Sequence, residues 1–181
     1  MNNCVLFIQG SGDEGYEADK KLVASLQTAL GKTYEVRYPQ MLSDETLSDF
    51  GWPPQIGKEI ANTKDNVILV GHSLGASLLL KYLSENEIKK KIRAIFLIST
   101  PFWRGNEDWK QGLKLHKNFP DKLPKKVPVF LYQCRDDEEV QFENLLLYAQ
   151  RLPQATVREI ANGGHQLNND LTIVAKDIKS L

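Results

Sequence analysis

The feature that most constrains the fold is the run VILVGHSLGASLLL at residues 67–80. Its β-branched start predicts a buried strand, its centre predicts a tight turn, and its end predicts a helix that begins near Leu74. Gly71 and Gly75 flank the turn, where the absence of a Cβ atom leaves room for the chain to reverse. Ser73 would project from this turn toward the helix N-terminus, where backbone N–H groups stabilise negative charge. The alternative is a small-residue turn that contains an ordinary serine.

Apolar runs that resemble strands alternate along the chain with segments that resemble helices. The runs expected as strands lie at 4–8, 34–38, 67–70, 92–98, 127–133 and 156–160. The segments expected as helices lie at 22–30, 56–61, 74–85, 139–152 and 171–181. This alternation predicts an α/β protein, a three-layer αβα sandwich in which a parallel sheet carries helices on both faces.

Length and charge restrict the classes of protein to consider. A chain of 181 residues is the size of one domain, so we expect a single domain over residues 1–181. Lysine plus arginine and aspartate plus glutamate both number 23, so no net charge favours nucleic acid or an anionic membrane as a partner.

The cysteines and the N-terminal residues indicate the compartment. Cys4 and Cys134 lie in apolar runs and lack metal-ligand spacing, so we expect core residues in a reducing compartment, with no disulfide and no metal. The N-terminus has only a five-residue apolar run before Gln9 and no basic region, which argues against a signal peptide. No apolar run reaches membrane-spanning length. The expectation is a cytoplasmic protein that does not bind a membrane.

Three polar loops follow predicted strands, at the sheet edge where parallel α/β proteins place their sites. Ser73 follows the third strand, CRDDEE at 134–139 follows the fifth, and NGGH at 162–165 follows the sixth. A serine hydroxyl is too weak an acid to attack a substrate unaided and requires a base within hydrogen-bond reach. The chain order of serine, acid and histidine is one of the orders known for such a catalytic set.

These motifs resemble those of α/β-hydrolase fold proteins over nearly the whole chain, in particular the small, nearly lidless serine hydrolases of the retinoblastoma-binding-protein type and their bacterial relatives. The likeness is carried by QGSG at 9–12, GHSLG at 71–75, DEEV at 137–140 and GGH at 163–165. It implies a minimal form of that fold, with six parallel strands in the order 2-1-3-4-5-6. Two residues depart from the pattern: Gln9 replaces a frequent histidine, which could alter the bracing of the oxyanion loop, and Gln141 replaces a frequent proline.

Ser73 is the expected nucleophile and His165 the expected base. The chain has three histidines. His72 is next to Ser73 in sequence and should point away from it, and His116 lies in an irregular segment. Both are expected to be structural or surface residues.

Two neighbouring carboxylates qualify as the acid that orients the imidazole, Asp136 and Asp137. The family resemblance favours Asp137, because relatives place the acid three residues before the valine that opens the next helix, here Val140. An aspartate at this place is also a natural helix N-cap, so a structural role remains an alternative.

The oxyanion of an acyl-transfer intermediate requires two backbone donors. Leu74 N–H, directly after the nucleophile, is one candidate, and Ser11 N–H is the other by the family resemblance. A phosphate-binding turn at 10–12 is the rival interpretation, but neither a G-x-G-x-x-G nor a P-loop lysine pattern is completed. We therefore expect no cofactor.

The expected activity is acyl transfer to water by an esterase, thioesterase or amidase, most of all a carboxylesterase-like enzyme acting on a small-molecule ester. The segment 99–126 is short and irregular and would stand in place of a lid. Four aromatic residues could form walls of the substrate pocket or could equally be packing residues. They are Trp52, Phe102, Trp103 and Trp109.

A competing hypothesis is a non-catalytic protein-interaction module on the same scaffold, because fold alone does not determine function. A protein partner is possible, but no sequence feature indicates one. An intact set of nucleophile, base and acid argues for the enzyme.

Overall fold

The computed structural model describes residues 3–11 and 15–181, so Gly12 of the predicted glycine-rich turn lies outside the described residues. Six strands pair in parallel in the order β2-β1-β3-β4-β5-β6. They are β1 (Asn3–Ile8), β2 (Tyr34–Arg37), β3 (Val67–His72), β4 (Ile92–Ile98), β5 (Val129–Cys134) and β6 (Thr156–Ile160). The predicted sheet and its strand order are confirmed.

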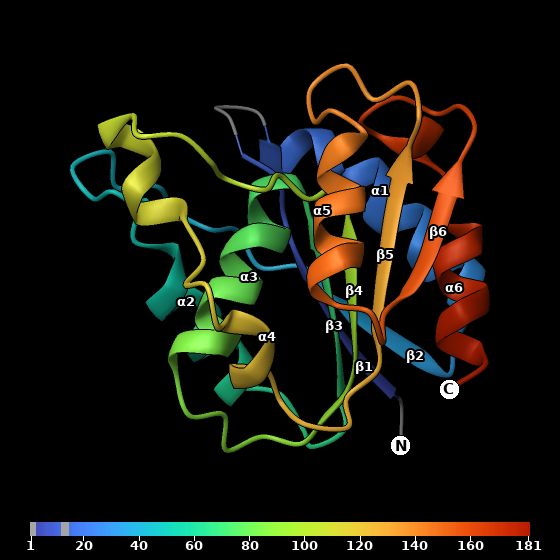
Figure 1. The fold of residues 1–181 in the computed structure, drawn as a ribbon. Coiled ribbons are helices and arrows are strands. Elements are labelled where there is room, and N and C mark those ends of the chain that lie inside the picture. Colours follow the sequence, from blue (N-terminus) through green and yellow to red (C-terminus); the bar gives the residue numbers. More distant parts are fainter. Residues whose placement is uncertain (1–2, 12–14) are drawn as a thin grey trace.

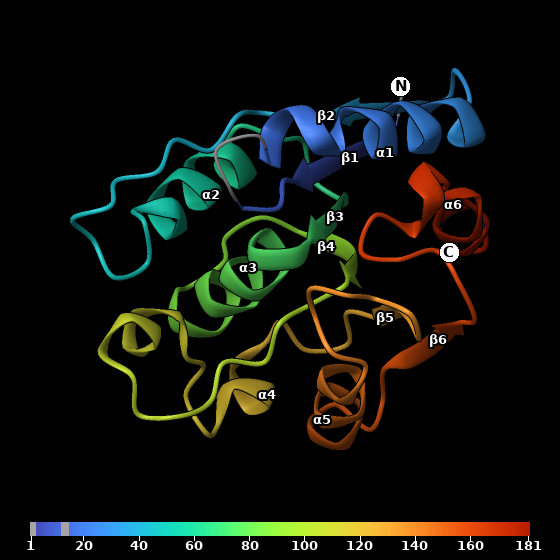
Figure 2. The same ribbon diagram turned by 90° about the horizontal axis from the view of Figure 1, so that it is seen from above.

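Helices cover both faces of this sheet and complete the three predicted layers (Figures 1 and 2). The α-helices are α1 (Gly15–Leu30), α2 (Trp52–Ala61), α3 (Ser73–Glu85), α4 (Phe119–Lys122), α5 (Glu143–Arg151) and α6 (Thr172–Lys179). Two 3₁₀ helices are η1 (Asp108–Leu113) and η2 (Leu167–Asn169). Figure 2 shows α1 and α6 on one face and α2 to α5 on the other. Among the described residues, no helix has the length and apolar composition needed to cross a membrane.

The sheet separates two apolar cores, because successive side chains of a strand point to opposite faces. Leu6 and Ile8 of β1 pack in the core on the α2–α5 face. Val5 and Phe7 pack in the core on the α1 and α6 face. Each fully buried side chain of this kind contributes about 2 kcal/mol to stability. The inner strands are therefore fixed from both faces, and their carboxyl ends form a rigid base for the loops at the top of Figure 1.

Three helices begin at residues well away from those predicted, and the first of them, expected over 22–30, begins at Gly15. The helix expected over 56–61 begins at Trp52, because Pro53 and Pro54 fall in its first turn, where proline's missing N–H is not needed. The helix expected over 139–152 begins only at Glu143.

The late start of α5 has a local cause in Asp137. Its Oδ1 atom accepts hydrogen bonds from the backbone N–H groups of Glu139, at 3.0 Å, and Val140, at 2.9 Å. These bonds form a turn that competes with helical hydrogen bonding. Asp137 therefore caps a turn ahead of α5 and not the helix itself.

Candidate active site

Ser73 lies at the sharp junction between β3 and α3, with no residue between strand and helix. Its backbone has a φ of +52°, a left-handed conformation that costs about 1–2 kcal/mol for a residue with a side chain. A Cβ atom at Gly71 would lie 2.6 Å from Ala76 Cα, and one at Gly75 would overlap the Gln9 carbonyl oxygen. The predicted strand, tight turn and helix are confirmed, and both flanking glycines are sterically required.

His165 lies in the loop after β6, and its ring is held by Asp137 from the loop after β5. The Nδ1 atom is 3.0 Å from each carboxylate oxygen of Asp137, and both side chains are buried. Gln133 Nε2 also donates a hydrogen bond to Asp137 Oδ2, at 2.7 Å. Because the carboxylate faces Nδ1, that nitrogen carries a proton and Nε2 is left as the basic atom.

The two partners shift each other's pKa in opposite directions. Burial raises the pKa of Asp137, but hydrogen bonds from His165 and from the Val140 N–H outweigh it and leave the value below the usual range. Burial lowers the pKa of His165, and the hydrogen bond and charge of Asp137 more than reverse this. The arrangement therefore favours an imidazolium at His165 once a proton reaches it.

Asp136, the other candidate acid, contacts the backbone of the glycine turn that precedes His165. Its Oδ1 atom accepts hydrogen bonds from the N–H groups of Gly163 and Gly164, both at 2.9 Å. These bonds lower the pKa of the exposed Asp136 carboxyl. Asp136 thus braces the glycine turn before His165, whereas Asp137 contacts the ring itself.

Ser73 and His165 line one small cavity of about 190 Å³, together with His72 and Glu139; we call it the His72 cavity. Among the described residues, no hydrogen bond joins the Ser73 hydroxyl to the His165 ring. The Nε2 atom instead lies 3.6 Å from Glu139 Oε2. Hydrogen bonds between nucleophile and base are often long before substrate binds, so the geometry is compatible with proton transfer.

The two predicted oxyanion donors lie on either side of Ser73. Leu74 occupies the first turn of α3, where backbone N–H groups have no acceptor within the helix. Ser11 follows β1, and both residues line two further cavities. Gln9, the departure from the family pattern, is buried and braces the Ser11 loop: its Oε1 accepts from Met41 N–H at 2.8 Å, and its Nε2 donates to the Gly10 carbonyl at 3.3 Å.

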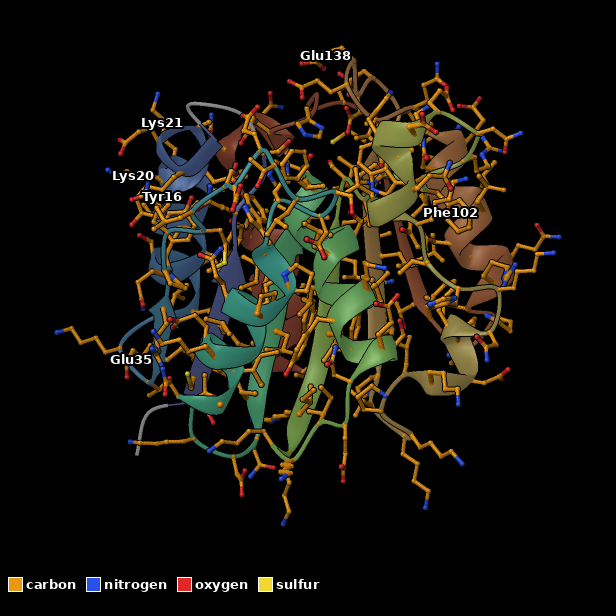
Figure 3. The ribbon with its side chains drawn as sticks, turned by 90° about the vertical axis from the view of Figure 1, so that its left-hand side faces the viewer. Tyr16, Lys20, Lys21, Glu35, Phe102 and Glu138 are labelled. Carbon is orange, nitrogen blue, oxygen red and sulfur yellow. The ribbon has the colours of Figure 1, made fainter. Side chains whose placement is uncertain are left out.

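The first of these cavities, the Met41 cavity, has a volume of about 450 Å³. Its apolar wall consists of Met41, Leu42, Phe50, Trp103, Trp109 and Leu113. The second, the Arg104 cleft, has a volume of about 650 Å³. Its charged side chains are Arg104, Lys110, Glu138 and Glu139. Figure 3 shows Tyr16, which borders the Met41 cavity, and Phe102, which borders the Arg104 cleft, on opposite sides of this end of the molecule.

The four aromatic candidates for pocket walls are not equivalent. Trp103 and Trp109 border both cavities and pack edge to face, with ring centroids 5.7 Å apart. Phe102 borders the Arg104 cleft alone. Trp52, the first residue of α2, is buried in the core, where its Nε1 donates to Ser43 Oγ at 3.1 Å, and it lines neither cavity.

Sequence reasoning did not find three polar residues of the site. Asp19 interrupts the apolar face of α1 at a buried position, one turn before Leu22, and this polar residue on an apolar stripe was the available signal. Gln133 is the second-last residue of β5, an otherwise apolar strand. Glu139 carries no signal of its own. Within residues 3–11 and 15–181, no group of three or more metal-ligating side chains is placed to hold a metal ion.

Comparisons with known proteins identify the family of the chain. A family model described as "Serine hydrolase" matches residues 16–171. YdeN of Bacillus subtilis (strain 168), which is named as a hydrolase, is 26% identical over 111 residues, covering 59% of this chain and 56% of YdeN. The chain thus aligns with little more than half of this curated relative.

Two solved structures share the architecture. SOBER1 from Arabidopsis thaliana has a TM-score of 0.71 at 16% identity, and the similarity covers 99% of both chains. An esterase domain from a Rhodothermus marinus protein has a TM-score of 0.68 at 16% identity, covering 98% of this chain and 85% of that one. At such low identity, these similarities show the fold alone.

Proposed function

The chain belongs to the serine hydrolase family and has the α/β-hydrolase fold, and from this premise we propose that it hydrolyses a carboxylic ester, or a related thioester or amide, through an acyl-Ser73 intermediate. The observation that carries the proposal is the His165 ring. It is held 3.0 Å from both Asp137 oxygens and borders the same cavity as Ser73.

The proposed reaction has two proton-transfer cycles. His165 Nε2 accepts the Ser73 proton as Oγ attacks the carbonyl carbon, and then gives it to the leaving group. Water next attacks the acyl-enzyme, losing its proton to the same Nε2, and Ser73 regains a proton as the acid product leaves. Asp137 keeps Nδ1 protonated and stabilises the imidazolium in both cycles.

Negative charge on the substrate oxygen would be stabilised by two backbone groups, Leu74 N–H and Ser11 N–H. The loss of one such donor typically costs about 3–4 kcal/mol in the chemical step. The loop that carries Ser11 is braced by the Gln9 side chain, and α3 is placed against the same loop by the close approach of Gly75 to the Gln9 carbonyl. Both donors therefore belong to elements with fixed relative positions.

In this proposal, the Met41 cavity receives an apolar part of a small-molecule substrate, with Trp103 and Trp109 as walls. The segment 99–126 acts as a fixed wall in place of a lid. Two observations support this: Trp103 Nε1 donates to Ser77 Oγ at 3.0 Å, and the Tyr148 hydroxyl donates to the Pro101 carbonyl at 2.9 Å. An ester is the favoured substrate class, because one structural relative is an esterase domain.

The test is covalent labelling by a fluorophosphonate, followed by intact mass, with p-nitrophenyl ester hydrolysis measured in parallel. We expect a single adduct on the native chain and none on Ser73→Ala. Asp137→Asn should slow labelling by about 10⁴-fold, because the histidine then favours the wrong tautomer. Asp136→Asn is the matched control: it changes the same charge one residue away and should slow labelling far less.

Two results would contradict the proposal. A folded native chain that forms no adduct and cleaves no ester would favour the interaction module. An equal loss in both aspartate variants would show that the Asp137 contact has no special role.

A further inference from the structure

His72 is fully enclosed directly behind the site, with 1% of its surface exposed, and both of its ring nitrogens face oxygen atoms. Nδ1 lies 3.0 Å from Oδ2 of Asp19, which comes from α1. Nε2 lies 3.0 Å from the backbone carbonyl oxygen of His165. The proposed reaction assigns no role to either His72 or Asp19.

The identity of these partners determines the protonation of the ring. A carbonyl oxygen only accepts hydrogen bonds, so Nε2 must carry a proton. Oδ2 of Asp19 also accepts a hydrogen bond from Gly10 N–H at 2.7 Å, and Oδ1 accepts one from Gln166 Nε2 at 3.2 Å. Two donors thus converge on Asp19, as expected for an ionised carboxylate, and such a carboxylate would accept a third hydrogen bond from a protonated Nδ1.

The ionisation of Asp19 has further support. Burial raises the pKa of this carboxyl, but the hydrogen bonds from His72 and Gly10 lower it more, so the value lies below the usual range. A buried charge is tolerated only when it is paired and hydrogen-bonded, and the His72 ring is the partner that Asp19 contacts.

We propose that Asp19 and a doubly protonated His72 form a buried ion pair that positions three segments of the active site relative to one another: the loop at Gly10, the turn at Ser73 and the loop of His165. The inference rests on the proposed function only for its catalytic consequence. Asp19 holds Gly10, next to the proposed oxyanion donor Ser11, and His72 holds the loop of the proposed base through the His165 carbonyl. Both are positioning residues, because they act through these neighbours.

The ion pair also determines the net charge beside the His165 ring. The rings of His72 and His165 are 4.8 Å apart, so a lone cation at His72 would oppose the imidazolium that forms at His165. The other titratable groups at this place are Asp19 against His72, Asp137 against His165, and Glu139, which lines the same cavity. With Asp19 ionised, the pair is neutral as a whole, and the Asp19 charge itself is among the causes that raise the pKa of His165.

Replacing Asp19 by asparagine would keep its shape but break this arrangement. A neutral His72 carries one ring proton, so either the Asp19 side or the His165 side loses its hydrogen bond. Turning the asparagine amide to donate to Nδ1 would remove the oxygen that accepts from Gly10 N–H. Each arrangement therefore leaves one loop without its contact.

The direct test is ¹⁵N NMR of the ring nitrogens in the native chain at pH 7. We expect two protonated ring nitrogens at His72, because each of them faces an oxygen atom that can accept a hydrogen bond. In Asp19→Asn, one of the two should lose its proton. A single protonated ring nitrogen at His72 in the folded native chain would overturn the proposal.

The catalytic consequence is tested by comparing Asp19→Asn with Asp177→Asn on a p-nitrophenyl ester. Asp177 is a second buried aspartate, bonded to Arg158 and Tyr132 away from the site, so it controls for loss of a buried carboxylate. We expect kcat to fall about 100-fold in Asp19→Asn with little change in KM, as for a small misplacement of reacting groups, and to stay near the native value in Asp177→Asn. Equal kcat in Asp19→Asn and the native chain would refute the positioning role.

The outcomes separate the two proposals. If the native chain neither labels nor hydrolyses, the proposed function fails, while the ring-nitrogen measurement still decides whether the ion pair exists. If Asp19→Asn does not fold, the same measurement on the native chain remains decisive.

Discussion

His165 lies between two carboxylates that differ in environment. Asp137 is buried and contacts Nδ1, whereas Glu139 is largely exposed and approaches Nε2 at 3.6 Å. Burial lowers the pKa of His165, but the hydrogen bond and charge of Asp137 raise it, and the Glu139 charge adds to the increase. Because the proposed base must be neutral to accept a proton, activity should rise with pH through a His165 pKa above the usual value.

This arrangement predicts the effect of Glu139→Gln. Removing the Glu139 charge removes one cause that raises the His165 pKa, so the acidic limb of the kcat/KM profile should move to lower pH. We expect a shift of roughly half a pH unit, because a charge pair at this distance with one largely exposed partner interacts by about 1 kcal/mol or less. The profile should be measured from about pH 5 to 9, where a histidine base titrates.

Glu143→Gln supplies the control, because it removes the same charge from an exposed residue at the start of α5. Its profile should match that of the native chain. A shift to higher pH in Glu139→Gln, or equal shifts in both variants, would contradict the assigned effect of Glu139.

For single residues, the sequence predicted the contact between Asp137 and His165 but not the contact between Asp19 and His72. Asp137 and His165 could be chosen because each follows a strand, and the structure brings their side chains together. The partnership of Asp19 and His72 depends on α1 packing against the end of β3, across 53 residues of chain. No local pattern encodes that approach, so His72 could only be predicted as structural or surface.

Among the elements, the junction of β3 and α3 is the most constrained sterically. The tight turn requires α3 to start against the end of β1, and Gly75 is the point of contact. A Cβ atom there would meet the backbone oxygens of Gln9 and Ile8, which cannot move without shifting β1 or α3. The oxyanion loop and the nucleophile are therefore coupled through one glycine.

Gly75→Ala should thus lower both stability and activity. Overpacking against backbone typically costs 1–3 kcal/mol, so we expect about 3 kcal/mol from urea unfolding, with a loss of fluorophosphonate labelling. Gly31→Ala is the comparison: Gly31 has a φ of +80° but nothing within 4 Å of its added Cβ, so we expect only about 1 kcal/mol and unchanged labelling. Equal effects of the two changes would rule out the steric explanation.

Most elements could be predicted from sequence, because buried parallel strands are continuous apolar runs. The start of α5 could not, since the hydrogen bonds of Asp137 to Glu139 and Val140 hold this segment in a turn. The start of α2 was obscured by Pro53 and Pro54, which look like helix breakers but fit the first turn.

At the scale of the whole molecule, one polar network joins strands β5 and β6 to helix α6. The Tyr132 hydroxyl of β5 donates to Asp177 at 2.6 Å, and Arg158 of β6 donates to both carboxylate oxygens of Asp177. The hydrogen bonds from Arg158 lower the pKa of Asp177, and burial only partly opposes them. Such a carboxylate contributes stability above its unfolded pKa of about 3.9, and this is lost as pH falls through its lower folded value.

Asp177→Asn should therefore destabilise the protein near neutral pH, by about 2 kcal/mol, the usual worth of hydrogen bonds to a charged group. The difference in Tm from the native chain should shrink in acid, below about pH 4, as the native carboxylate becomes protonated. Thermal unfolding at several pH values measures this. Asp108→Asn, on the exposed surface of η1, should leave Tm nearly unchanged, and a Tm difference for Asp177→Asn that stays constant with pH would contradict the network's role.

The position of β6 in the sheet has a consequence for how the protein loses activity. Ser73 follows β3, which has neighbours on both sides, whereas His165 follows β6, which pairs only with β5 among the described strands. Outer strands detach more easily than inner ones, since fewer contacts must break. Ser73 thus follows an inner strand that resists local unfolding, whereas its proposed base follows an edge strand that unfolds more easily. We therefore expect activity to be lost by local unfolding of β6 while the central strands remain folded.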